Sequence, residues 1–265
     1  MEPEGYADGG NEPGGDIPAA HHARGPVIMR TVRAVAWKEI QIFFLSPTAY
    51  IVGLIFLALA GFFFSRDLGD PFPEATLSPF FQGAVVIFIL LAPALTMRLI
   101  AEESKLGTIE LLLTSPVRDW EVILGKYLAS LIFFLALVAM SGFYVILLFV
   151  YASPDPGPIY AGYLGLVLYG AAALAVGLLT STLTNNQIVA AVVAMGILLA
   201  LFFADLAFGA VGGFPGEIIG ELGMKTHFDD FDRGIIDTKH IVYYLSVITF
   251  FLFLSVRALE ARRWR

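Results

Sequence analysis

The sequence predicts an all-α integral membrane protein with six transmembrane helices, and three observations support this fold class. Of the 265 residues, 58% are hydrophobic and 15% are charged, and the mean hydropathy is +0.78. Soluble domains are about half apolar and a quarter charged. Six long apolar stretches recur, most of them reaching the roughly 17 to 25 residues that cross a bilayer core. Basic residues also gather in alternate loops between the stretches.

Residues 1–27 are expected to form a disordered cytoplasmic tail. This tail is rich in Gly and Pro and carries five acidic residues, so it has too little apolar surface to offset the entropy of ordering. It lacks the basic start and apolar core of a secretory signal. Its adjacent His21 and His22 have no partners at metal-binding spacing, and the chain contains no Cys. No metal site or disulfide is therefore expected.

The first ordered element is expected to be an amphipathic helix over residues 30–45. Its apolar residues recur at helical spacing, and its basic residues fall mostly on other faces. The basic face suits anionic headgroups of the cytoplasmic leaflet, and a solvated helix packed on its neighbours explains the pattern nearly as well. Ser46 and Pro47 then provide an N-cap and a first residue for the next helix.

Six transmembrane helices are expected to follow. Their approximate bounds are residues 48–64, 80–97, 127–151, 160–179, 188–208 and 239–256. Helices are expected because lipid offers no hydrogen-bond partners to backbone N–H and C=O groups, which a helix pairs internally. A β-barrel would instead show strands of about ten residues in which apolar and polar residues alternate. The fourth stretch carries glycines that permit close helix approach, either within the chain or, as the weaker alternative, across a dimer. These glycines are Gly162, Gly165, Gly170 and Gly177.

The distribution of basic residues predicts that both termini are cytoplasmic. With the N-terminus inside, eleven Lys and Arg residues flank the cytoplasmic ends of the predicted spans. The outer loops then carry only four Lys and Arg residues, together with ten acidic residues. An excess of Lys and Arg marks the cytoplasmic loops of membrane proteins.

The loop between the second and third predicted spans carries the clearest functional pattern. Gly107 with Thr108 is expected to end one helix, and Ser115 with Pro116 is expected to start the third span. The short helix between these two breaks has room for about one and a half turns at the inner membrane surface. A helix of this length is unstable alone. It is therefore expected to dock on the chain's own bundle or on a partner.

Three segments resemble the permease subunits of ABC-2 type transporters. The first is Glu102-Glu103, followed by Gly107-Thr108-x-Glu110-x-Leu112-Leu113-x-Ser115-Pro116-Val117 and Gly125-Lys126. The second is the turn at residues 177–187. The third comprises residues 228–237 and the basic end of the last span, which look like the gliding-motility-associated branch of this family. The resemblance covers residues 28–265 and leaves only the tail outside it.

The resemblance implies an ABC-2 (type V exporter-like) fold with an N-terminal elbow helix and a short coupling helix. The residues implied to contact an ATPase subunit are Glu102, Glu103, Gly107, Thr108, Glu110, Leu112 and Pro116. The implied elbow residues are Trp37, Lys38, Glu39 and Phe43. On the residues alone, without the resemblance, charged side chains at a helix end near the membrane are usually a solvated face.

The resemblance also implies an assembly in the bacterial cytoplasmic (inner) membrane. Two permease subunits, identical or different, would sit on two cytoplasmic ABC ATPase subunits. An auxiliary subunit in the periplasm or the membrane is a further implied partner. Membrane lipid is expected around the chain, and no nucleic acid is expected as a partner.

No ATP site is expected in this chain. Gly125-Lys126 lacks the upstream glycine of the phosphate-binding G-x-x-x-x-G-K-[ST] loop and is followed by Tyr127. Lys126 is instead expected to extend toward headgroups at the cytoplasmic start of the third span. The chain is therefore not expected to be an enzyme or to hold a cofactor itself, and ATP and Mg²⁺ would bind the partner subunit.

Asp205 is the only clear acid within the predicted spans. A carboxylate there is a candidate polar site, because its charged form is costly to bury. It lies about one helical turn from the end of the fifth predicted span, so a structural or interfacial role stays open. The outer segment 211–239 is either a pair of short re-entrant helices, as the resemblance implies, or a folded surface loop.

The favoured function is a permease subunit that couples ATP hydrolysis on a separate subunit to export or to mechanical work. A secondary transporter or channel is the alternative, although such proteins commonly carry several ionisable groups at mid-membrane. A non-transporting scaffold subunit would share the hydropathy without needing an exposed coupling helix. An intramembrane enzyme is least favoured, because the spans show no metal-ligand or nucleophile spacing.

Overall fold

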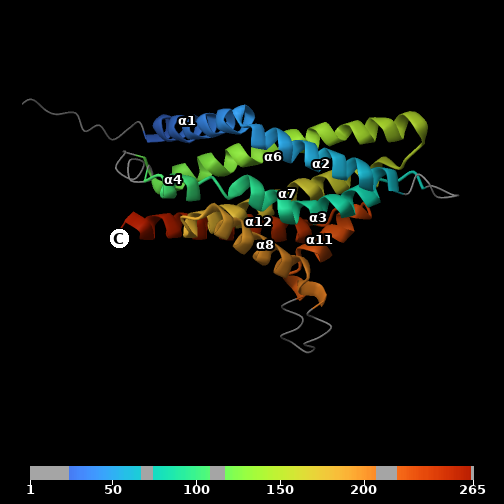
Figure 1. The fold of residues 1–265 in the computed structure, drawn as a ribbon. Helices are drawn as coiled ribbons and strands as arrows, with labels where there is room; N and C mark the ends of the chain where they lie inside the picture. Colours follow the sequence, from blue (N-terminus) through green and yellow to red (C-terminus); the bar gives the residue numbers. More distant parts are fainter. Residues whose placement is uncertain (1–23, 67–73, 108–116, 207–219, 264–265) are drawn as a thin grey trace, which may run out of the picture.

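The computed structural model describes residues 24–66, 74–107, 117–206 and 220–263 (Figure 1). Within these ranges the chain forms helices and turns and no β-strand, which confirms the all-α class. The helices are α1 (Arg24–Leu45), α2 (Pro47–Ser65), α3 (Ser78–Thr96), α4 (Ala101–Lys105), α6 (Asp119–Tyr151), α7 (Pro156–Leu183), α8 (Gln187–Phe202), α11 (Met224–Asp232) and α12 (Thr238–Arg263).

Apolar helices occupy the positions of all six predicted spans, but only some of them meet the length for a crossing. In the described part of the chain, four helical segments are long and apolar enough to cross a membrane. They are residues 78–105, 119–151, 156–183 and 238–262. α1 and α2 meet at a bend of 70° and would count together as a fifth, broken span. α8 has only 16 residues, so the crossing of all six helices stays a prediction.

The first helix was predicted from periodicity to begin at residue 30, and the second was predicted from local signals to begin at Ser46 and Pro47. Ser46 and Pro47 stand at the N-cap and first position of α2, as predicted. α1 begins at Arg24, inside the segment predicted to be a disordered tail, and its first turn contains Pro26, a residue that a first helical turn tolerates. Residues 1–23 of that predicted tail lie outside the described residues.

The third and fifth predicted spans also have different ends. α6 begins at Asp119, about two turns before the apolar stretch at Tyr127. The backbone N–H of Arg118 donates to Oε2 of Glu121 at 3.1 Å, which caps these polar turns. α8 ends at Phe202, before the predicted end at residue 208.

α7 lies at the centre of the bundle and packs against α3, α6, α8, α11 and α12. Its four predicted small-residue positions each face a side chain from another helix, and a Cβ at any of them would collide with that side chain. The facing pairs are Gly162 with Phe81, Gly165 with Phe231, Gly170 with Phe134 and Gly177 with Thr96. Packing within the chain is therefore confirmed as the role of these glycines.

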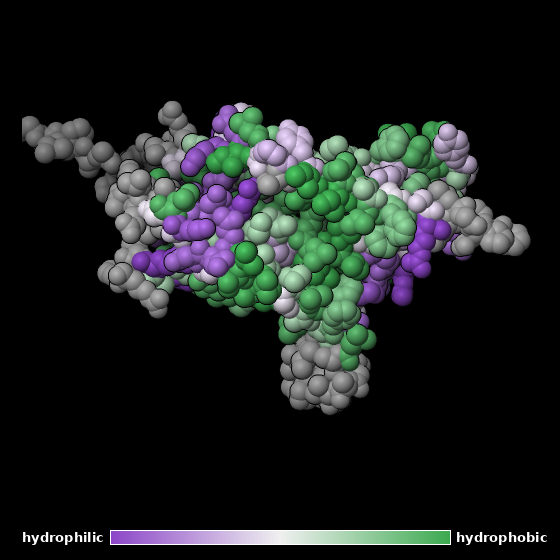
Figure 2. Space-filling view, in the orientation of Figure 1, coloured by the Kyte–Doolittle hydropathy of each residue, from purple (hydrophilic) through white to green (hydrophobic). Residues whose placement is uncertain are grey.

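The elongated bundle has two polar ends and an apolar middle. Figure 1 places α1, α4 and the C-terminus at one end, and α11 and the start of α12 at the other. Figure 2 shows hydrophobic residues across the centre of this face and hydrophilic residues toward both ends. The residues predicted to be cytoplasmic and those predicted to be external thus gather at opposite ends.

Candidate functional site

The candidate site is the set of contacts that hold the short helix α4. This helix directly precedes the segment predicted to contact an ATPase subunit. Glu102 and Glu103 belong to α4, and Gly107 follows it with a φ of +73°, which ends the helix as predicted. The other predicted contact residues lie outside the described residues. They are Thr108, Glu110, Leu112 and Pro116.

The first contact is a buried ion cluster that joins α1, α4 and α6. Nζ of Lys126 lies 2.7 Å from Oε1 of Glu39 and 2.9 Å from Oε1 of Glu103. The side chain of Lys126 is only 2% exposed, so the prediction that it extends toward headgroups is wrong. Two carboxylates compensate the buried ammonium, which would be costly to desolvate without them.

Gly125 explains how Glu39 reaches this lysine. A Cβ at Gly125 would lie 2.8 Å from Cγ1 of Val35 and 3.2 Å from the carbonyl oxygen of Val32. The absent side chain therefore lets α1 lie close against α6. The Gly-Lys pair stands within helix α6, and its observed contacts are helix packing and ion pairing.

The second contact comes from the end of α7. Oγ of Ser181 accepts hydrogen bonds from the backbone N–H groups of Ile100 and Ala101, at 3.1 Å each. It also donates to the carbonyl oxygen of Met97 at 3.2 Å. A serine from another helix thus satisfies amides at the start of α4, as an N-cap residue would.

The third contact comes from the end of α12. Nη1 of Arg262 donates to Oγ of Ser104 at 2.7 Å and to Oδ1 of Asn185 at 2.8 Å. The sequence pointed only to a cytoplasmic position for Arg262. The sequence feature that could have pointed to these contacts is the motif around Ser181, because a hydroxyl residue there interrupts an apolar helix. We call these three contacts, made by Lys126, Ser181 and Arg262, the α4 platform.

The predicted elbow residues divide between two faces of α1. Trp37 is 62% exposed and Lys38 is also exposed. Glu39 and Phe43 are buried, with Glu39 on Lys126 and the Phe43 ring stacked on Phe133 at 5.4 Å. Only the buried face of α1 therefore joins the α4 platform.

Asp205 does not belong to the α4 platform. It is half-buried and follows the end of α8, beside the backbone of Gly223. Within the outer segment predicted as 211–239, residues 220–239 are described and include the helix α11. Residues 211–219 lie outside the described residues, so a pair of re-entrant helices stays a prediction.

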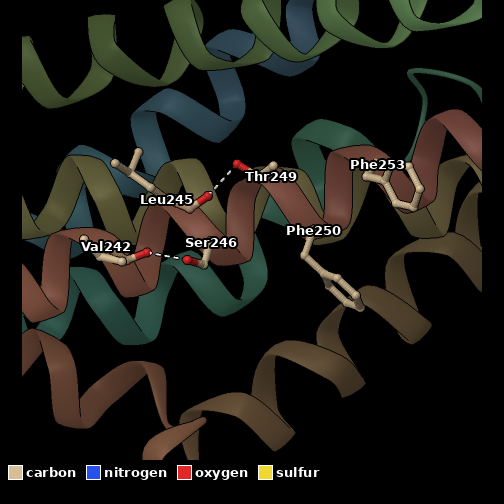
Figure 3. Close-up of a pocket in the computed structure, with 6 residues that line it drawn as sticks. All are labelled: Val242, Leu245, Ser246, Thr249, Phe250 and Phe253. Carbon is tan, nitrogen blue, oxygen red and sulfur yellow. Dashed lines mark hydrogen bonds between the residues drawn. The ribbon is translucent and has the colours of Figure 1, made fainter.

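A groove of about 550 Å³ runs along the exposed face of α12 (Figure 3). It is lined by Val242, Leu245, Ser246, Thr249, Phe250 and Phe253. Both hydroxyls donate to carbonyl oxygens of their own helix, Ser246 to Val242 at 2.7 Å and Thr249 to Leu245 at 2.8 Å. The groove therefore presents a mainly apolar surface.

Comparisons with known proteins give matches to transporters. Residues 73–220, more than half of the chain, match the model of the ABC-2 family transporter proteins. The chain is 32% identical over 90 residues to the probable multidrug ABC transporter permease YbhR of Escherichia coli strain K12. That match covers 33% of this chain and 23% of YbhR.

A second relative from the same strain is matched over a longer segment. The chain is 32% identical over 127 residues to the probable multidrug ABC transporter permease YbhS. That match covers 47% of this chain and 33% of YbhS. The matched segments thus span about a quarter to a third of these relatives.

Proposed function

The chain belongs to the ABC-2 family of transporter proteins, and from this we propose that it is the permease subunit of an ATP-driven transporter. It is a membrane subunit of a transporter. We propose that ATP and Mg²⁺ bind a separate cytoplasmic ATPase subunit. The cycle on that subunit would move the segment 107–116, and the helices of this chain would respond.

The α4 platform is the observation that carries this proposal. α4 leads directly into the segment 107–116, and polar side chains from α6, α7 and α12 hold it. Ser181 and Lys126 are buried, so their contacts are shielded from water and resist separation. A displacement of the segment would therefore reach three long helices through α4.

Lys126 extends the same path to α1. Because it pairs with both Glu103 on α4 and Glu39 on α1, a movement of α4 would also displace α1. The exposed residues Trp37, Ile42 and Leu45 give α1 an apolar surface on its other side. This surface suits the membrane interface and supports the proposed role of α1 as an elbow helix.

We propose that the transporter lies in the bacterial inner membrane with both chain termini and α4 on the cytoplasmic side. A second permease subunit, identical or different, would complete it, and an auxiliary subunit could join in the periplasm or membrane. The groove on α12 would face acyl chains or another subunit. The matched relatives are named as multidrug permeases, which favours export. The resemblance of residues 228–237 to the gliding-motility-associated branch makes mechanical work the competing outcome.

The proposal is tested by purifying the tagged chain from its native membrane and identifying copurifying ATPase subunits by mass spectrometry. Glu110→Arg is expected to reduce the retained ATPase at least tenfold. Ser181→Ala should retain the ATPase, but it orphans two buried N–H groups at about 1–3 kcal/mol. ATP turnover in nanodiscs should then change, by at most about tenfold for each 1.4 kcal/mol of this cost that falls on the transition state of the cycle.

Glu74→Arg serves as the control, because Glu74 is exposed at the opposite end of the bundle. Both retention and turnover should stay at wild-type levels in this variant. If no ATPase copurifies with the wild-type chain, or if Glu110→Arg retains it fully, the ATP-coupled function is wrong. A channel or a scaffold subunit would then be favoured.

A further inference from the structure

Two buried histidines join α11 to α12 at the end of the bundle opposite α4. Nδ1 of His227 lies 2.8 Å from Nδ1 of His240. On its far side, Nε2 of His227 lies 3.0 Å from the carbonyl oxygen of Glu221. Nε2 of His240 lies 2.8 Å from Oδ2 of Asp230. A continuous line of polar contacts therefore runs from a backbone carbonyl, through two rings, to a carboxylate.

Two distributions of protons make every contact in this line a hydrogen bond, and they differ in which Nδ1 atom donates. The Glu221 carbonyl and the Asp230 carboxylate can only accept, so both Nε2 atoms must carry hydrogen. Between the two facing Nδ1 atoms, one must donate and the other must accept. Because the partner of His240 is an anion, the extra proton belongs on His240. In that arrangement the positive ring lies beside the Asp230 carboxylate, and the Nδ1 atom of His227 accepts from His240.

A further proton on His227 would break this line. Two N–H groups would face each other across 2.8 Å, and two positive rings would lie side by side. Desolvation lowers the pKa of His227 below its usual value of 6.5, and the charge of His240 lowers it further, against a raising contribution from the Glu221 carbonyl. Neutral His227 therefore contributes stability to the native state above pH 6.5. This contribution falls as the pH drops from 6.5 toward the lower pKa of the folded state.

The segment before α11 is tied to α12 at the same place. The hydroxyl of Tyr243 donates to the carbonyl oxygen of Leu222 at 2.6 Å, and its ring lies against His227 at 3.8 Å between centroids, tilted by 35°. The hydroxyl of Tyr244 donates to the carbonyl oxygen of Met224 at 2.7 Å. Residues 220–228 thus meet α12 through the histidine pair and these two tyrosines.

The neighbouring charges form their own contacts. Ion pairs join Lys239 to Glu221 at 3.1 Å, Lys225 to Asp229 at 2.8 Å, and Arg233 to Asp230 at 4.0 Å. These pairs are partly or largely exposed, so each contributes little to stability. The Asp237 carboxylate accepts from the backbone of Lys239 at 2.9 Å. α7 contributes Tyr169 beside Tyr244, and α3 contributes the neutral Gln82 on Asp229.

We propose that the His227–His240 pair is a proton-operated latch, in which binding of one further proton releases residues 220–228 from α12. The latch lies at the end of the bundle away from α4, so it responds to the pH on that side of the membrane. This regulation is additional to the proposed ATP-driven function and does not depend on the substrate.

The latch is tested with two spin labels attached to introduced Cys residues. The chain contains no Cys of its own, so only these two positions are labelled. Leu222→Cys and Tyr160→Cys are both at exposed positions, one on the latched segment and one on α7. In nanodiscs, the distance between the labels at pH 7 is expected to change to a second, distinct distance as the pH falls from 7 to 5. The midpoint should lie below pH 6.5, and the ratio of closed to open forms should fall by at most about tenfold per pH unit, as one proton requires.

Two variants separate the latch from a general effect of acid. His227→Asn places an amide oxygen where it can accept from His240 without titrating, so the distance found at pH 7 should persist to pH 5. His240→Ala removes the donor, and the distance that the wild type shows at pH 5 should appear at every pH. In His21→Gln/His22→Gln protein, ¹⁵N-histidine spectra report only the two latch rings, and one ring should titrate with the same midpoint as the distance.

Three results would overturn the proposal. The wild-type distance could stay constant from pH 7 to 5. His227→Asn could respond to acid as the wild type does. Added Zn²⁺ could bind stoichiometrically at pH 7 and abolish the response to acid, which would make the pair a metal site rather than a latch.

Discussion

At the scale of residues, Lys126 departs furthest from its expected environment. A lysine at the start of a span commonly reaches the headgroups, yet this one is enclosed between Glu39 and Glu103. Removing one partner of a buried ion pair leaves the remaining charge uncompensated, which costs more than the pair itself contributes. The cluster is therefore sensitive to the loss of its single cation.

Lys126→Met is expected to destabilise the protein by about 3–5 kcal/mol, because it leaves the buried Glu39 carboxylate without its cation. The measurement is the unfolding free energy in detergent, from denaturant titration. Glu260→Gln is the control, since the Arg257–Glu260 pair is 62% and 40% exposed and should contribute at most about 1 kcal/mol. If both variants lost the same unfolding free energy, the buried cluster would contribute no more to stability than an exposed ion pair.

Asp232, on α11, provides a prediction about pH. Its Oδ2 accepts from Oγ of Ser78 at 2.6 Å and from Nε2 of Gln82 at 2.9 Å. Among the described residues its buried Oδ1 has no hydrogen-bond partner. Desolvation raises the pKa of Asp232 above 3.8, although the bonds from Ser78 and Gln82 lower it. The native state therefore holds this proton more tightly than the unfolded chain.

Because the folded pKa is raised, the stability contributed by Asp232 falls as the pH rises from 3.8 to the folded pKa. Asp232→Asn keeps an acceptor for Ser78 but removes the charge. The unfolding free energy of this variant minus that of the wild type should increase as the pH rises through that window. Above the window this difference should stay constant. Denaturant titrations from pH 4 to 7 measure the unfolding free energy of the variant minus that of the wild type, and a fall in this difference with rising pH would contradict the assignment.

At the scale of elements, α7 organises the bundle. Its glycines let aromatic side chains from α3, α6 and α11 lie directly against its backbone. Close packing of this kind leaves no room for an added methyl group. The same helix ends at Ser181 and so carries both the core of the bundle and one contact of the α4 platform.

Gly170→Ala is expected to destabilise the protein by about 1–3 kcal/mol, because the new Cβ collides with the ring of Phe134. Gly142→Ala in α6 is the matched control. A Cβ at Gly142 meets nothing within 4 Å, so the higher helix propensity of Ala should stabilise by up to about 1 kcal/mol. Thermal unfolding of both variants measures the contrast, and a neutral Gly170→Ala would mean that α7 packs more loosely.

At the scale of the whole molecule, an apolar belt separates two polar ends (Figure 2). The end with α4 carries Lys105, Arg118 and Arg262, and the end with α11 carries Asp229, Asp230 and Asp232. Because basic residues are retained on the cytoplasmic side during insertion, the α4 end is expected to be cytoplasmic.

Single cysteines test this orientation in intact cells. Leu106→Cys and Ile236→Cys lie at exposed positions at the two ends. A membrane-impermeant maleimide should label Ile236→Cys directly and Leu106→Cys only after permeabilisation. The reverse pattern would place α4 outside, where no cytoplasmic ATPase subunit could reach it.

The sequence by itself determined the helical class, the positions of six apolar helices, and the breaks at Ser46–Pro47 and Gly107. These features depend on hydrophobic periodicity and on local backbone preferences, which neighbouring residues specify. Only the tertiary structure decided that Lys126 pairs with Glu39, that Ser181 holds α4, and that His227 faces His240. Lys126 and Glu39 are 87 residues apart, and Ser181 is 80 residues from Ala101. Such partners are selected by how the helices pack, because a buried polar group must be satisfied by whichever neighbour the packing brings within reach.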